Sequence, residues 1–130
     1  MMVKVELLFY FRSALKPSTM PQYIFLIRED LSRYPMPQEQ LKAIVDAHVK
    51  WARELSAKGI FKDGNGIKSD GRLIEMINGD LMVEPIRDVR EGVGGYYIIE
   101  AADLDAAVEI AKGCPTYKDG DMIEVRELGA

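Results

Sequence analysis

The chain has 130 residues, enough for one domain whose hydrophobic core needs neither disulfide nor metal. Its net charge is −4, with 17 basic residues scattered among 21 acidic ones, which argues against a nucleic-acid partner because phosphate binding needs clustered lysine and arginine. No stretch approaches the roughly 20 apolar residues of a membrane span, so no membrane association is expected. The single cysteine, Cys114, excludes an intrachain disulfide framework and suits a reducing, cytoplasmic location.

Residues 1–19 are predicted to be an N-terminal extension to a domain at residues 20–130. The apolar run Leu7–Phe11 is too short for the core of a signal peptide. Two interpretations stay open for the extension. It is either a loosely attached arm or an extra strand, Val3–Phe11, that pairs with a sheet edge or a second subunit.

The first predicted strand is Tyr23–Ile27, which is rich in β-branched and aromatic residues. After a polar loop, apolar residues at helical spacing predict a long helix over about Gln38–Lys58, closed by Gly59. Residues 62–71 are rich in turn formers, and we interpret Asp63–Gly66 as a turn.

A hairpin is predicted next, because Arg72–Ile77 and Asp80–Val83 flank an Asn-Gly pair that favours a type I′ turn. Gly92–Gly95 is predicted to be a glycine turn, in which the glycines permit positive φ and close backbone approach at a bulge. A buried strand at Tyr96–Ile99 should follow it.

The C-terminal part is predicted to be a capped helix and a final strand. Asp103 is an N-cap candidate, and Gly113 with Pro115 ends the helix. Met122–Arg126 alternates as a strand should. The cysteine between helix and strand is interpreted as packing at the helix end.

This order of elements predicts an α+β fold of the ferredoxin-like βαββαβ type, with an antiparallel sheet, both helices on one face and an excursion between the second and third core strands. The other sheet face then needs a cover. A second copy of the same sheet is the simplest one, so a homodimer formed through that face is expected.

Four segments together resemble the YCII-related superfamily, in its branch named for an Asp-Gly-Pro-Phe motif. They are Tyr23–Ile27, Trp51–Gly59, Gly94–Ala101 and Ile123–Arg126, and the similarity runs from about Met20 to Leu128. The resemblance implies a dimeric ferredoxin-like fold. It also implies, from a few relatives, a histidine–aspartate pair and the dehydrochlorination of an aromatic ring.

One departure from the family pattern concerns its motif aspartate. Val83 stands at that position, and Glu84 is the nearest carboxylate. Any role that needs the motif aspartate is therefore in doubt in this chain.

The candidate catalytic residues are His48, Glu84 and Asp88. His48 is the single histidine, and a carboxylate from Glu84 or Asp88 could hold its ring in one tautomer as a general base. The alternative is a structural histidine that hydrogen-bonds within the fold.

Three further side chains are candidates for substrate binding. Arg87 or Arg90 could clamp a carboxylate or phenolate, and Trp51 could line an aromatic pocket, although each also suits a structural role. No metal and no cofactor are predicted. Two functions remain open: a cofactor-free small-molecule enzyme, or a non-catalytic dimeric module that binds a small molecule or a protein.

Overall fold

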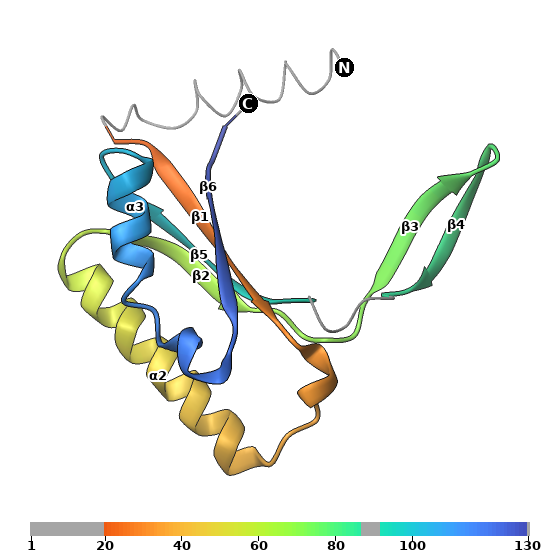
Figure 1. Ribbon diagram of the computed structural model, residues 1–130, viewed down its shortest axis with the longest axis horizontal. Coiled ribbons are helices and arrows are strands. Elements are labelled where there is room, and N and C mark those ends of the chain that lie inside the picture. Colours follow the sequence, from red (N-terminus) through yellow and green to blue (C-terminus); the bar gives the residue numbers. More distant parts are fainter. Residues whose placement is uncertain (1–19, 87–91, 130) are drawn as a thin grey trace.

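A computed structural model describes residues 20–86 and 92–129 of the chain, so the extension at residues 1–19 lies outside it (Figure 1). The body of the domain consists of β1 (Gln22–Glu29), α2 (Gln38–Ala57), β2 (Phe61–Gly66), β5 (Gly92–Glu100), α3 (Leu104–Ala111) and β6 (Met122–Glu127). Two short 3-10 helices, η1 (Leu31–Arg33) and η3 (Pro115–Asp119), lie between these elements. A hairpin of β3 (Arg72–Ile77) and β4 (Asp80–Pro85) separates β2 from β5.

The main sheet has the strand order β2-β5-β1-β6, and each neighbouring pair is antiparallel. Helices α2 and α3 lie on the same side of it (Figure 1). This is the α+β, ferredoxin-like arrangement that the order of elements predicts. The hairpin is the predicted excursion, and it forms a separate two-stranded sheet.

Alternate residues of the central strands build the core beneath the helices. Tyr23, Phe25 and Ile27 of β1 are buried on the helix side. The core cluster also contains Trp51, Leu55, Tyr97, Ile99, Ala101, Ala107, Ala111 and Cys114. The intervening residues of β1 and β5 face the opposite side, which we call the open face: Ile24, Leu26, Tyr96 and Ile98, each half-buried.

Helix α2 keeps the predicted apolar spacing, but only its C-terminal half is covered. Trp51 and Leu55 are buried, whereas Leu41 and Val45 are 37% and 49% exposed. A helix of 20 residues is about 30 Å long, and its N-terminal turns extend past the strands (Figure 1). The sequence thus predicts the spacing of the apolar residues on α2, but how many of them are buried depends on how far the sheet extends beneath the helix.

The predicted turn at Asp63–Gly66 is wrong, because these residues belong to β2, an edge strand. Their partner is β5, with an irregular register between Phe61 and Asp63. Backbone hydrogen bonds to a neighbouring strand outweigh the low strand preference of an Asp-Gly-Asn-Gly sequence.

The predicted glycine turn at Gly92–Gly95 is also wrong, since the whole segment lies inside β5. Its glycines do not adopt positive φ. The close approach and the bulge are confirmed. The pairing with β1 shifts register between Ile27 and Arg28, and a Cβ on Gly92 would lie only 2.1 Å from Cδ1 of Leu31.

Two local predictions are confirmed in detail. The Asp103 side chain caps α3 by accepting a hydrogen bond from the backbone N–H of Ala106, at 2.8 Å. Asn78 and Gly79 both have positive φ, 52° and 87°, as a type I′ turn requires.

Candidate functional site

His48 meets Tyr97 where α2 crosses the central strand β5. The Nδ1 atom of His48 lies 2.5 Å from the Tyr97 hydroxyl. The same hydroxyl donates to the backbone carbonyl of His48, at a longer 3.4 Å. The two rings are nearly parallel, with their centroids 5.9 Å apart. His48 is half-buried, so its ring is held by the core and also reaches the surface of the domain.

Tyr97 is fixed by aromatic neighbours on both sides. The rings of Trp51 and Phe61 stand edge-on to it, at centroid distances of 4.9 and 6.3 Å. Burial raises the pKa of the Tyr97 phenol, and the nearby Cys114 thiol, when ionised, raises it further. Tyr97 is therefore a neutral phenol at physiological pH and acts on His48 as a hydrogen-bonding group.

Trp51, a candidate for substrate binding, is a core residue in the structure. It is 8% exposed, and besides Tyr97 it stacks on Phe25 with centroids 6.3 Å apart. Its position one turn after His48 makes it part of the packing that holds the His48–Tyr97 pair. A direct contact between Trp51 and a substrate stays a prediction.

Cys114 packs into the same core cluster, as its place at the helix end predicts. Burial raises the pKa of its thiol to about 11, although a backbone hydrogen bond at Thr116 opposes the rise. At neutral pH the side chain is thus a buried, protonated thiol. Its chemistry is that of a small apolar group rather than a nucleophile.

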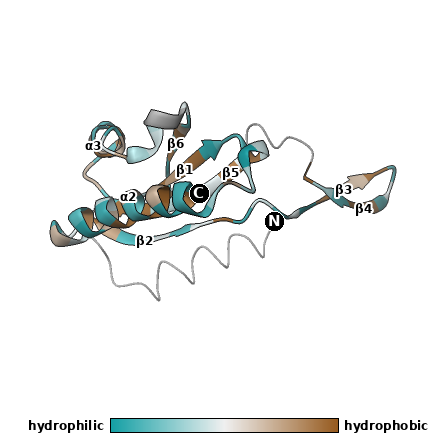
Figure 2. Cartoon of the chain, turned by 90° about the horizontal axis from the view of Figure 1, so that it is seen from below, coloured by the Kyte–Doolittle hydropathy of each residue, from teal (hydrophilic) through white to brown (hydrophobic). Residues whose placement is uncertain are grey.

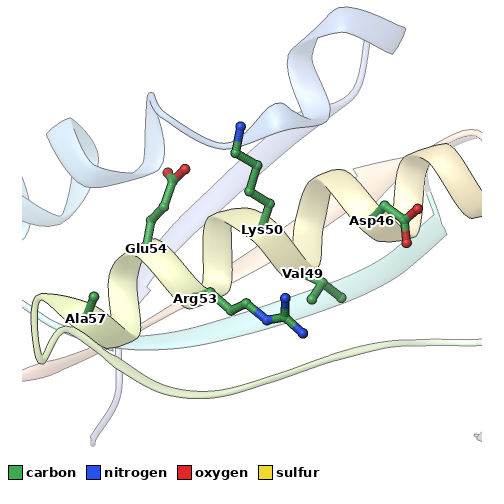
Figure 3. Close-up of a pocket in the computed structure, with 6 residues that line it drawn as sticks. All are labelled: Asp46, Val49, Lys50, Arg53, Glu54 and Ala57. Atoms are coloured by element: carbon green, nitrogen blue, oxygen red, sulfur yellow. The ribbon is translucent and has the colours of Figure 1, made fainter.

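A groove of about 550 Å³ runs along the outer side of α2 (Figure 3). It is lined by Asp46, Val49, Lys50, Arg53, Glu54 and Ala57. Figure 3 shows Lys50 and Glu54 extending on one side of the helix and Arg53 on the other. These charged groups do not converge on a point, and His48 is not part of the lining. The groove is therefore a weak candidate for an active site.

A second polar cluster links η1 to the residues of and just after η3. Arg33 forms an ion pair with Asp121, whose side chain is 7% exposed. Asp121 also accepts a hydrogen bond from the buried hydroxyl of Thr116, at 3.3 Å. Beside it, Tyr34 donates to Glu29 at 3.1 Å. Burial, and then the Glu29 charge, raise the pKa of Tyr34 to about 12.

A family model for the YCII-related domain matches residues 22–128, most of the chain. The chain belongs to the YCII-related family. No curated protein matches it. Within residues 20–86 and 92–129, no helix is long and apolar enough to cross a membrane. The same ranges hold no group of three or more His, Cys, Asp or Glu side chains arranged to bind a metal ion.

In this YCII-related protein the remaining candidate residues follow the hairpin. Glu84 lies on β4, and the hairpin projects away from the layer that contains α2 (Figure 1). Arg87, Asp88 and Arg90 lie outside the described residues. The pairing of His48 with Glu84 or Asp88, and the binding of a substrate by the arginines, stay predictions.

Sequence reasoning missed Tyr97 as the partner of the histidine. The available signal was weak: Tyr96 and Tyr97 must point to opposite faces of a strand, so one of them must face the helices. Tyr97 does so, while Tyr96 lies on the open face and donates to Asp63 at 3.1 Å. Which helical residue lies above Tyr97 depends on how helix and sheet pack, and that was not predictable from the pattern.

Proposed function

We propose that this YCII-related protein is a cofactor-free enzyme that removes a proton from a small carbonyl or aromatic compound, with His48 as the general base. The observation that carries the proposal is the short contact between His48 Nδ1 and the Tyr97 hydroxyl. A general base must present an unprotonated nitrogen in a fixed orientation, and this contact fixes the orientation of the ring.

The proposal requires one tautomer of His48. The Tyr97 hydroxyl has a single proton, and the proposal assigns that proton to the His48 carbonyl, at 3.4 Å, rather than to Nδ1. When that proton points to the carbonyl, the hydroxyl oxygen must accept from Nδ1–H. The neutral ring then carries its proton on Nδ1, and Nε2 has the lone pair. Nε2 is accordingly the atom proposed to take up the substrate proton.

Tyr97 differs in one respect from the carboxylate expected beside His48. Because burial raises its phenol pKa, it orients the ring without adding a negative charge. The imidazolium formed on proton transfer would gain little charge stabilisation from Tyr97. The proposal therefore retains Glu84 or Asp88 as a nearby negative charge that would stabilise the imidazolium, without a hydrogen bond to either ring nitrogen, and Arg87 or Arg90 as the group that binds an anionic substrate.

The proposed reaction begins with transfer of a carbon-bound proton to Nε2. The electron pair of the broken C–H bond delocalises into an adjacent carbonyl, or it expels a leaving group from the neighbouring carbon. The imidazolium then returns its proton to the product or to water. No oxidant or reductant is required, which agrees with the absence of a predicted cofactor.

The test is hydrogen exchange in D₂O, which reports proton abstraction even when no net product forms. The full chain is incubated with a panel of small ketones, carboxylic esters and chlorinated aromatic compounds, and loss of C–H signals is followed by proton NMR. We expect exchange in at least one class, reduced about 100-fold or more in His48→Gln. Exchange no faster than in buffer for every compound, or equal rates in His48→Gln, would overturn the proposal.

The positioning role of Tyr97 has a separate readout. His48 is the single histidine of the chain, so its ring nitrogens give unambiguous ¹⁵N NMR signals. We expect protonation at Nδ1 in the neutral ring and loss of this preference in Tyr97→Phe. A ring protonated at Nε2 would contradict the proposed base.

A second candidate, a non-catalytic binding module, is favoured by the position of the α2 groove. Its lining residues exclude His48, and they include two acidic and two basic side chains, a mixture that suits a contact surface. Binding of a compound without exchange of its protons, unchanged in His48→Gln, would support the module.

A further inference from the structure

Helix α2 carries an exposed line of apolar side chains, which we call the α2 stripe. It consists of Leu41, Val45 and Val49, which follow one another at intervals of four residues and are 37%, 49% and 42% exposed. Neighbouring members are about 6 Å apart along the helix axis, so the stripe is about 12 Å long. Apolar residues at helical spacing are typical of a helix face that packs against another element.

The α2 stripe lies on the flank of the helix that faces β2. Trp51 lies on the other flank, beside the end of α3, because a Cβ on Gly113 would be 3.3 Å from its Nε1 atom. Val45 and Val49 are rotated from Trp51 by roughly 120° and 160° around the helix axis. Figure 3 shows Val49 on the side of α2 along which β2 runs, and β2 lies beside α2 in both overall views (Figures 1 and 2).

Strand β2 is the edge of the sheet on this flank. In the order β2-β5-β1-β6, its one neighbour among the described residues is β5. The outer side of an edge strand presents backbone N–H and C=O groups that a further strand can bind. Tyr23 of β1 and Phe61 of β2 both pair with Ile99, so β1 and β2 begin at the same end of the sheet. The N-terminal extension is therefore joined to the domain at the end where β2 begins.

The N-terminal extension contains a segment, Val3–Phe11, with the pattern of an amphipathic strand. Its alternate positions are all apolar: Val3, Val5, Leu7, Phe9 and Phe11. The positions between them include Lys4 and Glu6. In an extended chain the alternate side chains project to one face, which we call the apolar face of the extension.

We propose that Val3–Phe11 adds a strand to the outer edge of β2 in its own chain, with its apolar face packed against the α2 stripe. This strand runs antiparallel to β2, because its end connects to the start of β1 at the end of the sheet where β2 also begins. The connection, residues 12–21, can span about 33 Å when extended. The path past β2 and β5 to β1 covers three strand spacings, or about 14 Å.

The two apolar surfaces match in length and direction. Alternate residues of a strand are about 6.8 Å apart, close to the spacing of about 6 Å between members of the α2 stripe. Helix α2 ends where β2 begins, so the added strand runs in the same direction as the helix. Val5, Leu7 and Phe9 then lie along the three members of the stripe in order.

The other edge of the sheet, β6, suits the extension less well. Since β6 is antiparallel to β1, a strand that ends near the start of β1 would be parallel to β6, and parallel pairing is slightly less stable per residue. The inference assigns the extension to β2 and does not depend on the reaction proposed at His48.

The first test compares two neighbouring leucines by amide hydrogen exchange of the full chain. Leu7 lies on the apolar face of the extension and Leu8 on the other. We expect the amides of β2 to exchange tenfold faster or more in Leu7→Asp, and at the wild-type rate in Leu8→Asp. The amides of β6 should be unchanged in both variants, which shows that each is folded. Equal exchange of β2 in the two variants, or faster exchange at β6 alone, would overturn the proposal.

The second test locates the extension by cross-linking. Val45→Cys is combined with Leu7→Cys or with Leu8→Cys, and each protein is treated with a short bismaleimide; the single-cysteine variants report any reaction of Cys114. We expect a cross-link within one chain for the pair with Leu7→Cys, at least tenfold more abundant than for the pair with Leu8→Cys. Cross-links only between chains would assign the extension to a second copy and overturn the proposal, as would the absence of any cross-link.

Discussion

Trp51 stands edge-on to Tyr97, with ring centroids 4.9 Å apart and ring planes at 80°. This contact joins the covered half of α2 to the central strand that carries the partner of His48. The position of the candidate base therefore depends on the packing of the core beneath it.

Trp51→Ala should lower the free energy of unfolding by about 3–5 kcal/mol, because it removes a large buried ring that touches Phe25 and Tyr97. Urea denaturation measures this loss. Val49→Ala is the matched control on the same helix, since Val49 is 42% exposed and its truncation should change stability by less than about 0.5 kcal/mol. An unchanged free energy of unfolding in Trp51→Ala would contradict the structural role of Trp51 and leave its predicted role in substrate binding.

Gly92→Ala should destabilise the domain by about 1–3 kcal/mol through overpacking. The added methyl would lie 2.1 Å from Cδ1 of Leu31, a buried side chain that has little room to move. Thermal unfolding measures the effect. Gly66→Ala provides the comparison, because the nearest atom to its added methyl is 4.0 Å away. Equal melting temperatures for the two variants would show that Leu31 can repack.

Much of the fold could be predicted because local and global signals agree. The Asn-Gly turn, the Asp103 cap and the aromatic strand at Tyr23–Ile27 each favour one local structure, and the order of elements then favours one topology. The prediction failed at β2 and at Gly92–Gly95. At both places the strand forms because a neighbouring strand supplies its hydrogen bonds, and the local amino-acid composition gives no sign of that neighbour.

The candidate site was less predictable than the fold. His48 could be chosen from the sequence because it is the only histidine, on an apolar helical stripe. Its observed partner, Tyr97, is 49 residues away in the chain and meets it only through helix–sheet packing. The spacing of residues in the sequence identifies which of them share a face of a helix or strand. It does not determine which residue of the helix packs against which residue of the sheet.

Asp121→Asn should cost about 1–3 kcal/mol, because the substitution keeps the shape of the side chain but removes the charge that faces Arg33. The buried Thr116 hydroxyl, which donates to the same carboxylate, would also lose a charged acceptor. Asp46→Asn tests the same chemistry on the surface, where Lys42 and Asp46 are 75% and 62% exposed, and no measurable change is expected there. If both variants denature at the wild-type urea concentration, the cluster does not stabilise the fold.

The protein should lose stability in alkaline solution because the thiol of Cys114 is buried. The pKa of its thiol is raised from 9.0 to about 11 in the folded chain, so the folded state favours the protonated form. Below about pH 9 the thiol is protonated in both the folded and the unfolded chain. As the pH rises from about 9 to about 11, the thiol ionises in the unfolded chain but not in the folded one, so the free energy of unfolding falls. The shift corresponds to about 2–3 kcal/mol. The measurement is the urea midpoint at several values of pH across that window.

The Cys114→Ala variant distinguishes the effect of thiol ionisation on stability from the effect of tyrosine ionisation. The pKa of Tyr97 is also raised by burial, and its contribution lies above the tyrosine reference value of 10.0. The variant should be less stable than the wild type at pH 8 because a buried atom is lost, yet its stability should fall less steeply between pH 9 and pH 11. A slope identical to that of the wild type would show that the thiol ionises as readily in the folded chain as in the unfolded one. Rapid reaction of native Cys114 with a thiol reagent at neutral pH would contradict its burial independently, because a buried, protonated thiol should react only when the chain opens.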